Sequence, residues 1–343
     1  MEIHRVMIIQ NNHNYHIGSY TGSHDKLPIG TYRLKQDPRS LEYFLQRVED
    51  FILPPRIYGD TKHIDRILNT FNTTNKNLSV LLGGTKGAGK TIDAKQLCVK
   101  AGLPVIIIDE TYEGSDLISF MASPELGRCV VLIDEYEKLY VSGGRNGNDV
   151  TMLQLLDGAC NAAHLFILTV NNLHGLNDNL INRPSRIFYR RLYDSVPDSV
   201  INEILDVELI NQNWREEILQ VFDKFTSITF DIIMALVSEV NRYDESPLEC
   251  AKMMNFTPQN VFVKRFQIHK DGTRRDLGND TLSFAEEEFE TRIYESSEAN
   301  SDFCWYYVKI KDLVKTSPTS WIYRHVNGDV IELIKSSPIS LLF

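Results

Sequence analysis

The feature that most constrains this chain is one eight-residue segment, which fits the pattern G-x-x-x-x-G-K-[S/T] at every position. Its residues are Gly84, Thr85, Lys86, Gly87, Ala88, Gly89, Lys90 and Thr91. An apolar run precedes it and a helical pattern follows it, which argues against a glycine-rich turn with a chance Lys-Thr pair. Glycines let backbone N–H groups surround a phosphate, and a helix start adds partial positive charge. The segment predicts that Lys90 reaches the β- and γ-phosphates of a nucleotide and that Thr91 holds Mg²⁺.

The middle of the chain predicts the fold class. Its apolar runs do not alternate with polar residues, as is typical of strands buried on both faces. They are Leu78–Leu82, Val105–Ile108, Cys129–Ile133, Leu165–Thr169 and Ile187–Tyr189. Helical or polar stretches separate the runs, which favours an α/β domain with a five-stranded parallel sheet and flanking helices.

The remaining segments differ in pattern. Val200, Ile204 and Val207 have helical spacing and are typical of a small helical domain. The tail is β-rich, with Asn327-Gly328 as a hairpin turn signal, and the N-terminal segment includes a predicted helix at 41–52. We therefore expect an N-terminal mixed β/α segment (1–50), an α/β nucleotide-binding domain (51–192), a helical lid (193–255) and a β-rich accessory domain (256–343).

Charge and composition narrow the function. The chain has 46 acidic and 36 basic residues, a net charge of −10, which disfavours non-specific binding to a phosphate backbone. No apolar run approaches the roughly 18 residues that span a bilayer, and the N-terminus lacks the features of a signal peptide. The five cysteines never occur in a CxxC spacing, as expected for reduced thiols rather than disulfides or a zinc site. We expect a cytoplasmic protein that does not enter a membrane.

Polar residues follow two of the apolar runs. Asp134 and Glu135 directly follow Cys129–Ile133, where the first carboxylate is suited to the Mg²⁺ shell and the second to polarising a water molecule as a general base. Asn171 follows the run Leu165–Thr169, where its amide would orient that water. The alternative for Asn171 is an asparagine that opens a turn.

Two arginines, Arg183 and Arg186, lie just before the run Ile187–Tyr189. An arginine that reaches a γ-phosphate across a subunit boundary stabilises the charge of the transition state. A pair of surface salt bridges is the alternative.

The order of these segments resembles an AAA+ ATPase over about residues 51 to 255. The run Arg183-Pro184-Ser185-Arg186 resembles the Arg-Pro-Gly-Arg of the AAA clade, and the segments 132–138 and 180–186 are similar to AAA ATPases encoded by tailed bacteriophages. The resemblance implies that Gly84 to Thr91 form Walker A, Asp134 and Glu135 Walker B, Asn171 sensor 1, Arg183 and Arg186 paired arginine fingers, and Tyr58 and Gly59 part of the adenine-reading segment. A sensor-2 arginine is missing from 226–229.

The resemblance also implies a function. It predicts a homo-oligomer, usually a hexameric ring or spiral, that binds ATP and Mg²⁺, hydrolyses ATP at subunit interfaces and remodels a protein or protein–nucleic-acid assembly. If the protein is viral, its place is the host cytoplasm. The alternatives are a loader-type factor for DNA replication or recombination machinery and an ATP-gated assembly scaffold with little turnover.

Three features bear on these alternatives. Tyr112 stands where family members that thread polypeptide carry an aromatic pore residue, and an ordinary packing role is the alternative. The loop 143–148 is either a second pore loop or a plain linker. A basic cluster is either a nucleic-acid contact or a solvated hairpin face, and it consists of Lys264, Arg265, Lys270, Arg274 and Arg275.

Overall fold

The computed structural model describes the chain in segments and divides it into two compact units, Met1–Tyr193 and Asp194–Phe343. The described residues are 7–11, 13–18, 24–112, 114–141, 150–158, 162–173, 176–193, 195–223, 225, 228–254, 256, 260–283, 286, 288–298, 301–317 and 320–336. The predicted second pore loop, 143–148, lies outside them.

The first unit is built on one nine-stranded sheet. In spatial order its strands are β1 (Met7–Asn11), β2 (Asn14–Gly18), β4 (Tyr43–Arg47), β3 (Thr31–Gln36), β6 (Val105–Ile108), β7 (Val130–Ile133), β8 (Leu165–Val170), β5 (Leu78–Gly84) and β9 (Tyr189–Tyr193). The run β6-β7-β8-β5-β9 is parallel throughout, which confirms the predicted parallel α/β sheet. The whole sheet has nine strands rather than five, and its last parallel strand is Tyr189–Tyr193 rather than Ile187–Tyr189. All residues of β5, β7 and β8 are buried, as continuous apolar runs require.

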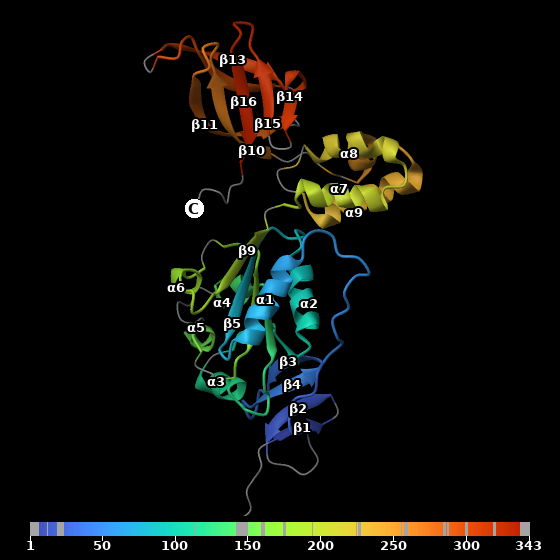
Figure 1. Cartoon of the computed structure of the whole chain (residues 1–343), viewed down its shortest axis with the longest axis vertical. Helices are drawn as coiled ribbons and strands as arrows, with labels where there is room; N and C mark the ends of the chain where they lie inside the picture. Colours follow the sequence, from blue (N-terminus) through green and yellow to red (C-terminus); the bar gives the residue numbers. More distant parts are fainter. Residues whose placement is uncertain are drawn as a thin grey trace, which may run out of the picture. The chain divides into compact units, whose positions relative to one another are not determined.

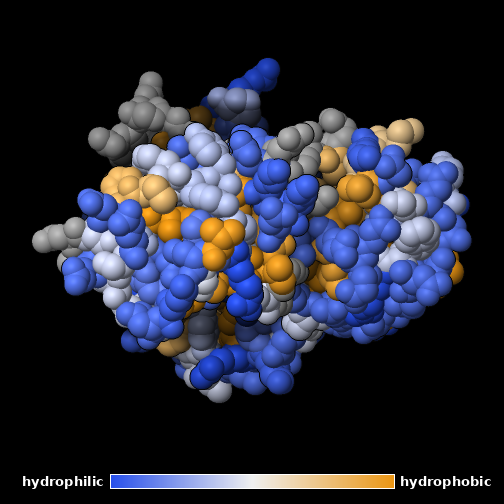
Figure 2. Space-filling model, turned by 90° about the horizontal axis from the view of Figure 1, so that it is seen from above, coloured by the Kyte–Doolittle hydropathy of each residue, from blue (hydrophilic) through white to orange (hydrophobic). Residues whose placement is uncertain are grey.

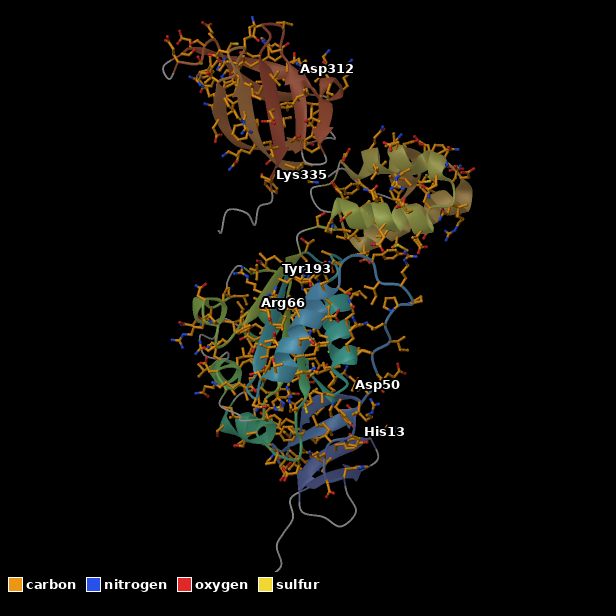
Figure 3. The ribbon with its side chains drawn as sticks, viewed as in Figure 1. His13, Asp50, Arg66, Tyr193, Asp312 and Lys335 are labelled. Carbon is orange, nitrogen blue, oxygen red and sulfur yellow. The ribbon has the colours of Figure 1, made fainter. Side chains whose placement is uncertain are left out.

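The N-terminal strands continue this sheet. β3 pairs in parallel with β6, and β4, β2 and β1 follow in antiparallel order. The helix predicted at 41–52 is wrong, because Tyr43–Arg47 is strand β4. Asp50, labelled in Figure 3, accepts hydrogen bonds from the Thr31 backbone N–H at 2.8 Å and from the Arg47 guanidinium at 2.8 and 2.6 Å. This side chain ties the chain after β4 to the start of β3.

Helices cover both faces of the sheet. They are α1 (Lys62–Thr73), α2 (Lys90–Ala101), α3 (Ser115–Met121), α4 (Tyr136–Tyr140), α5 (Val150–Leu156) and α6 (Asp178–Ile181). α1 and α2 lie side by side, and their buried residues share one core cluster with Val80, Leu82 and Ile167 (Figure 1). The alternate residues Leu81 and Phe166 belong to a second cluster, which contains residues of α3 to α6. The sheet therefore separates two cores, one on each face.

The second unit has a helical part and a β-rich part, as predicted. The helices are α7 (Asp198–Glu208), α8 (Arg215–Phe222), α9 (Phe230–Tyr243) and α10 (Pro247–Met253), with one 3₁₀ turn, η1 (Gln212–Trp214). α9 begins at a Thr229 cap, whose hydroxyl accepts from the Ile232 N–H. None of the helices in the described part of the chain has the length and apolar character of a bilayer-crossing segment.

The β-rich part has two sheets. The five-stranded sheet has the order β11 (Arg274–Ser283), β10 (Asn260–Ile268), β16 (Val330–Lys335), β15 (Ser320–Arg324) and β14 (Val314–Ser317). The two-stranded sheet pairs β12 (Glu288–Tyr294) with β13 (Phe303–Lys309). A 3₁₀ turn, η2 (Ile310–Asp312), follows β13. The described pairs are antiparallel. The hairpin predicted about Asn327-Gly328 is confirmed as β15–β16.

Candidate active site

The phosphate-binding loop begins where β5 ends beside β9. The Thr85 N–H donates a hydrogen bond to the Tyr193 carbonyl at 2.8 Å, and a Cβ added to Gly84 would lie 2.1 Å from that oxygen. Gly87 and Gly89 have φ values of 73° and 107°, in the region that favours glycine. The glycines of the predicted motif are thus required by its backbone path, and α2 starts directly after the loop.

Lys90 lies against this loop. Its side chain is buried, and its ammonium donates hydrogen bonds to the carbonyls of Gly84 at 2.5 Å and Thr85 at 2.7 Å. Burial lowers the pKa of Lys90, while the nearby carboxylates of Glu137 and Asp134 oppose that shift. The site therefore places a cation at the N-terminus of α2, where the helix also presents partial positive charge.

Asp134 and Glu135 follow β7 and are fixed by a residue of the neighbouring strand β8. The Thr169 hydroxyl donates to Asp134 Oδ1 at 2.5 Å and accepts from the Glu135 backbone N–H at 2.9 Å. Glu135 has φ of 52°, a left-handed conformation that is unusual for this residue type. Strain of this kind persists where the surroundings hold it in place, and here the Thr169 hydroxyl supplies such a contact.

The Glu135 carboxylate is the centre of the site. Its Oε1 accepts a hydrogen bond from Asn171 Nδ2 at 2.7 Å and lies 3.3 Å from Lys86 Nζ of the phosphate-binding loop. Its Oε2 pairs with the Lys138 ammonium on α4. These donors, Lys138 foremost, hold the pKa of Glu135 below its ordinary value. The carboxylate is therefore charged at neutral pH, as a general base requires.

The structure brings together most of the residues assigned from the sequence. β5, β7 and β8 are adjacent parallel strands, so the loop, the acidic pair and Asn171 meet at their carboxyl ends. Asn171 is further fixed by its backbone N–H, which donates to Glu137 Oε1 at 2.9 Å. Tyr58 and Gly59 lie half-buried before α1, and their part in adenine binding stays a prediction.

The residues assigned to Mg²⁺ have a suitable donor set. Thr91 offers a hydroxyl and Asp134 a carboxylate, and both side chains are exposed. Mg²⁺ prefers oxygen ligands and is held through one or two carboxylates together with substrate phosphates. The described residues contain no group of three or more His, Cys, Asp or Glu that would form a metal cage. This pair fits a metal that binds together with a nucleotide.

The two candidate arginines differ in their surroundings. The Arg186 guanidinium is almost buried, contacts Asp157 Oδ2 at 2.6 and 2.8 Å through two nitrogens, and donates to the Asn179 carbonyl at 2.9 Å. The Arg183 side chain is exposed, and within the described residues it forms no ion pair. The Arg186 guanidinium is thus held by contacts within its own chain, while the Arg183 side chain is exposed.

Tyr112 is a packing residue in this structure. Its ring is buried, its hydroxyl donates to the Leu34 carbonyl at 2.8 Å, and its ring meets Tyr43 edge-on at 5.5 Å between centroids. The ring packs on residues of β3 and β4, so the structure gives no support to a polypeptide-gripping role for it.

The basic cluster is largely neutralised within its own domain. Lys264 pairs with Asp276 at 2.8 Å, Arg265 with Asp280 at 2.8 Å, and Arg274 with Glu332 at 2.7 Å. Lys264, Arg265 and Arg274 thus pair with carboxylates around the β10–β11 hairpin. Because these charges are already neutralised, a nucleic-acid contact at this cluster is less favoured.

Two residues of the candidate active site, Thr169 and Lys138, were not predicted from the sequence. Thr169 was recognised only as part of a pattern, although it joins Asp134 to the Glu135 backbone. Lys138 pairs with Glu135 at a spacing of three residues, which is the one signal that favours this contact on a helix.

Comparison with known proteins agrees with this geometry. Residues 80–192 match the family model described as ATPase family associated with various cellular activities (AAA). The ATP-dependent zinc metalloprotease FtsH of Aster yellows witches'-broom phytoplasma (strain AYWB) is 32% identical over 157 residues, which cover 40% of this chain and 23% of that protein. FtsH of Caldicellulosiruptor bescii is 29% identical over 162 residues, covering 40% of this chain and 26% of that protein. The chain thus spans about a quarter of the length of these relatives.

One solved structure similar to this chain is a RuvB variant of Thermotoga maritima, with a TM-score of 0.43 and 16% identity. The alignment covers 58% of this chain and 70% of that one. The family match spans β5, the phosphate-binding loop, the acidic pair and both arginines, all of which lie in the first unit. Residues 80–192 therefore resemble an AAA ATPase domain, and the similar FtsH proteins are described as ATP-dependent.

Proposed function

We propose that this protein is an oligomeric ATPase that completes its active sites between subunits and uses ATP hydrolysis to remodel a protein or protein–nucleic-acid assembly. The observation that carries the proposal is the Glu135 carboxylate, which is held by Asn171 beside the phosphate-binding loop. The similar FtsH proteins are named as ATP-dependent, which also supports the use of ATP by this protein. The similarity to phage-encoded ATPases stays a prediction.

The chain's own residues divide the work of hydrolysis. Glu135 accepts a proton from the attacking water as general base, and Asn171 holds that carboxylate in position and orients the water. Lys90 and the loop N–H groups bind the phosphates. Thr91 and Asp134 would hold Mg²⁺, which neutralises charge on the phosphates when it is bound.

The arginine contacts support shared active sites. Arg186 is held by Asp157 and the Asn179 carbonyl, and this fixes the turn that presents Arg183 at the surface. The backbone N–H of Arg186 also donates to the Arg183 carbonyl at 2.9 Å. We assign Arg183 as the residue that reaches the ATP of a neighbouring subunit and Arg186 as its support.

Glu135→Gln tests the proposal because it keeps the size and hydrogen-bonding capacity of the side chain but removes the base. ATP binding and nucleotide-dependent assembly should persist, while turnover should fall by roughly 10²- to 10⁴-fold. Glu249→Gln is a matched control, since Glu249 also pairs with a lysine three residues later but lies in α10.

The measurements are ATP turnover, nucleotide affinity by calorimetry and particle images with a slowly hydrolysed ATP analogue. Normal turnover in Glu135→Gln would refute the assigned base. Wild-type chains that stay monomeric with the analogue would refute shared sites. Full biological activity of Glu135→Gln would instead favour the ATP-gated scaffold.

A further inference from the structure

The two-stranded sheet of β12 and β13 has one face against the domain core and one face outward. Ile293 and Val308 are buried, and Ile293 belongs to the same core cluster as Trp321 and Leu333. Successive side chains of a strand point to opposite faces. The packing of Ile293 and Val308 therefore fixes which residues of both strands point outward.

The outward face of β13 carries three exposed aromatic residues in alternate positions. Phe303, Trp305 and Tyr307 are 43%, 54% and 58% exposed. On the face seen in Figure 2, hydrophobic residues lie in groups among hydrophilic ones. Three large rings in line on one strand form a surface of the kind that marks a binding site. We name Phe303, Trp305 and Tyr307 the aromatic column.

An arginine on the opposite strand shows that the rings of the aromatic column can bind a positively charged group. Arg292 pairs with Trp305 across the two strands, and its guanidinium carbon lies 5.6 Å from the Phe303 ring centre and 5.4 Å from the Trp305 ring centre. The faces of these rings thus already bind a guanidinium of their own domain. Aromatic faces attract cations because of their electron-rich π-systems.

The charges around the column favour a cationic partner. Glu290 lies directly opposite Tyr307, whose pKa is raised by a hydrogen bond to that carboxylate and also by Glu288. The turn between the strands adds Glu295, Glu298 and Asp302. Two arginines of the neighbouring sheet also contact these strands: Arg265, which is paired with Asp280, and Arg275, which lies 4.0 Å from the Tyr294 ring centre. The five acidic residues still outnumber Arg292, Lys309 and Arg275, so the surface attracts positive charge and repels phosphate.

β13 also offers backbone groups. Within the described residues its backbone pairs with β12 alone, so its second edge has no partner strand, and the strand contains no proline. An unpaired edge is a template for an added strand, in which main-chain hydrogen bonds give affinity and alternate side chains give specificity. This feature suits a polypeptide rather than a nucleic acid.

We propose that β13 is the docking site for an extended, Lys/Arg-rich polypeptide segment of another protein. The segment adds to the free edge of β13, and its basic side chains stack on Trp305 and Tyr307 and reach Glu290. This site is in the β-rich domain and does not depend on the function assigned to the ATPase domain.

The test uses the full chain and fluorescein-labelled peptides of twelve residues that alternate arginine with threonine. A peptide with glutamate in place of arginine and a labelled single-stranded oligonucleotide are the comparison probes. The arginine peptide should bind best, and the double change Trp305→Ala/Tyr307→Ala should weaken its binding about tenfold or more. Glu290→Gln should weaken it less.

Phe262→Ala is the matched control, because Phe262 is 42% exposed in the same domain but lies on β10. It should leave peptide affinity unchanged, and all variants should keep the ATP turnover of the wild type. Trp305→Lys guards against a folding effect, since a surface lysine is soluble yet repels the peptide. Equal binding by the double variant, equal binding of both peptides, or tighter binding of the oligonucleotide would overturn the proposal.

Discussion

At the Glu135 carboxylate, three donors act on one side chain. Asn171 and Lys86 contact Oε1, and Lys138 contacts Oε2. All three favour the charged form, which lowers the pKa of Glu135. A general base must be ionised, so protonation of Glu135 stops hydrolysis only when the pH drops through this lowered value.

Lys138→Ala should therefore shift the pH dependence of hydrolysis. Without the largest stabilising contact the pKa of Glu135 rises, and the acidic limb of kcat moves to higher pH. The check is kcat from about pH 3.5 to about pH 8 for this variant and for Lys252→Ala, which breaks a similar exposed pair in α10. Superimposable acidic limbs in both variants and the wild type would show that Lys138 does not tune the base.

Asp93 is a second carboxylate with several partners, one turn into α2. It is 9% exposed, its Oδ2 lies 2.6 Å from His63 Nε2 and accepts from the Tyr193 hydroxyl, and its Oδ1 accepts from Gln96 at 3.1 Å. Tyr193, labelled in Figure 3, also accepts the Thr85 N–H through its carbonyl. Asp93 thus joins α1, α2 and β9 around the phosphate-binding loop.

Tyr193→Phe should destabilise the first unit by about 1.5–3 kcal/mol, because it removes a buried hydrogen bond to a charged group. Tyr189→Phe is the comparison, since among the described residues the Tyr189 hydroxyl has the neutral Thr70 hydroxyl as its hydrogen-bond partner, at 2.8 Å. This substitution should cost about 0.5–1.5 kcal/mol. Urea unfolding of both variants measures the difference. An equal loss would mean that the charge on Asp93 contributes nothing to the Tyr193 contact.

Among the elements, the pairing of β5 with β9 determines the path of the phosphate-binding loop. Gly84 lies opposite Tyr193 in the register, where any Cβ meets backbone rather than a flexible side chain. The loop cannot keep both this pairing and a larger residue at position 84. Gly102, which ends α2 with φ of 64°, has nothing within 4 Å of its added Cβ.

Gly84→Ala should therefore reduce ATP affinity at least about tenfold and lower the melting temperature, since a Cβ contact below 3 Å forces backbone apart. Gly102→Ala should cost only about 1–2 kcal/mol for its left-handed backbone and keep ATP affinity. Calorimetric titration with an ATP analogue and thermal unfolding check both variants. Wild-type affinity in Gly84→Ala would contradict the role of the β5–β9 pairing.

The elements also show which parts of the fold can be predicted from sequence. β5 to β8 were predictable because their residues are apolar on both faces. At 41–48 the apolar positions fit a helix, yet Tyr43 and Leu45 are buried at a spacing of two, and Leu41 is 61% exposed. Neighbouring strands decide between these patterns, and they contribute contacts that no local window contains.

The same limit applies to the site. The phosphate-binding loop is contiguous in sequence, so its pattern identifies it. The Asp93 contacts also join residues 63, 93 and 193, which come together only through the sheet order β8-β5-β9 and the packing of α1 on α2. Likewise the sequence assigned Arg183 and Arg186 the same role, because only tertiary contacts with Asp157 distinguish them.

For the whole molecule, the role of Arg183 determines whether one chain suffices for hydrolysis or a neighbouring subunit must supply this arginine. Mixing two inactive variants tests it directly. Arg183→Ala keeps the base but lacks the finger, and Glu135→Gln keeps the finger but lacks the base.

If Arg183 acts on the neighbouring subunit's ATP, mixed oligomers contain sites in which an intact base faces an intact finger, so turnover should return partly and peak at an intermediate ratio. Mixtures of Arg183→Ala with the double variant Arg183→Ala/Glu135→Gln contain no finger and should stay inactive. Arg186→Ala should instead melt at lower temperature, because it leaves Asp157 without its guanidinium partner. Absence of recovery at every ratio, in oligomers shown by light scattering to be mixed, would place the finger within one chain.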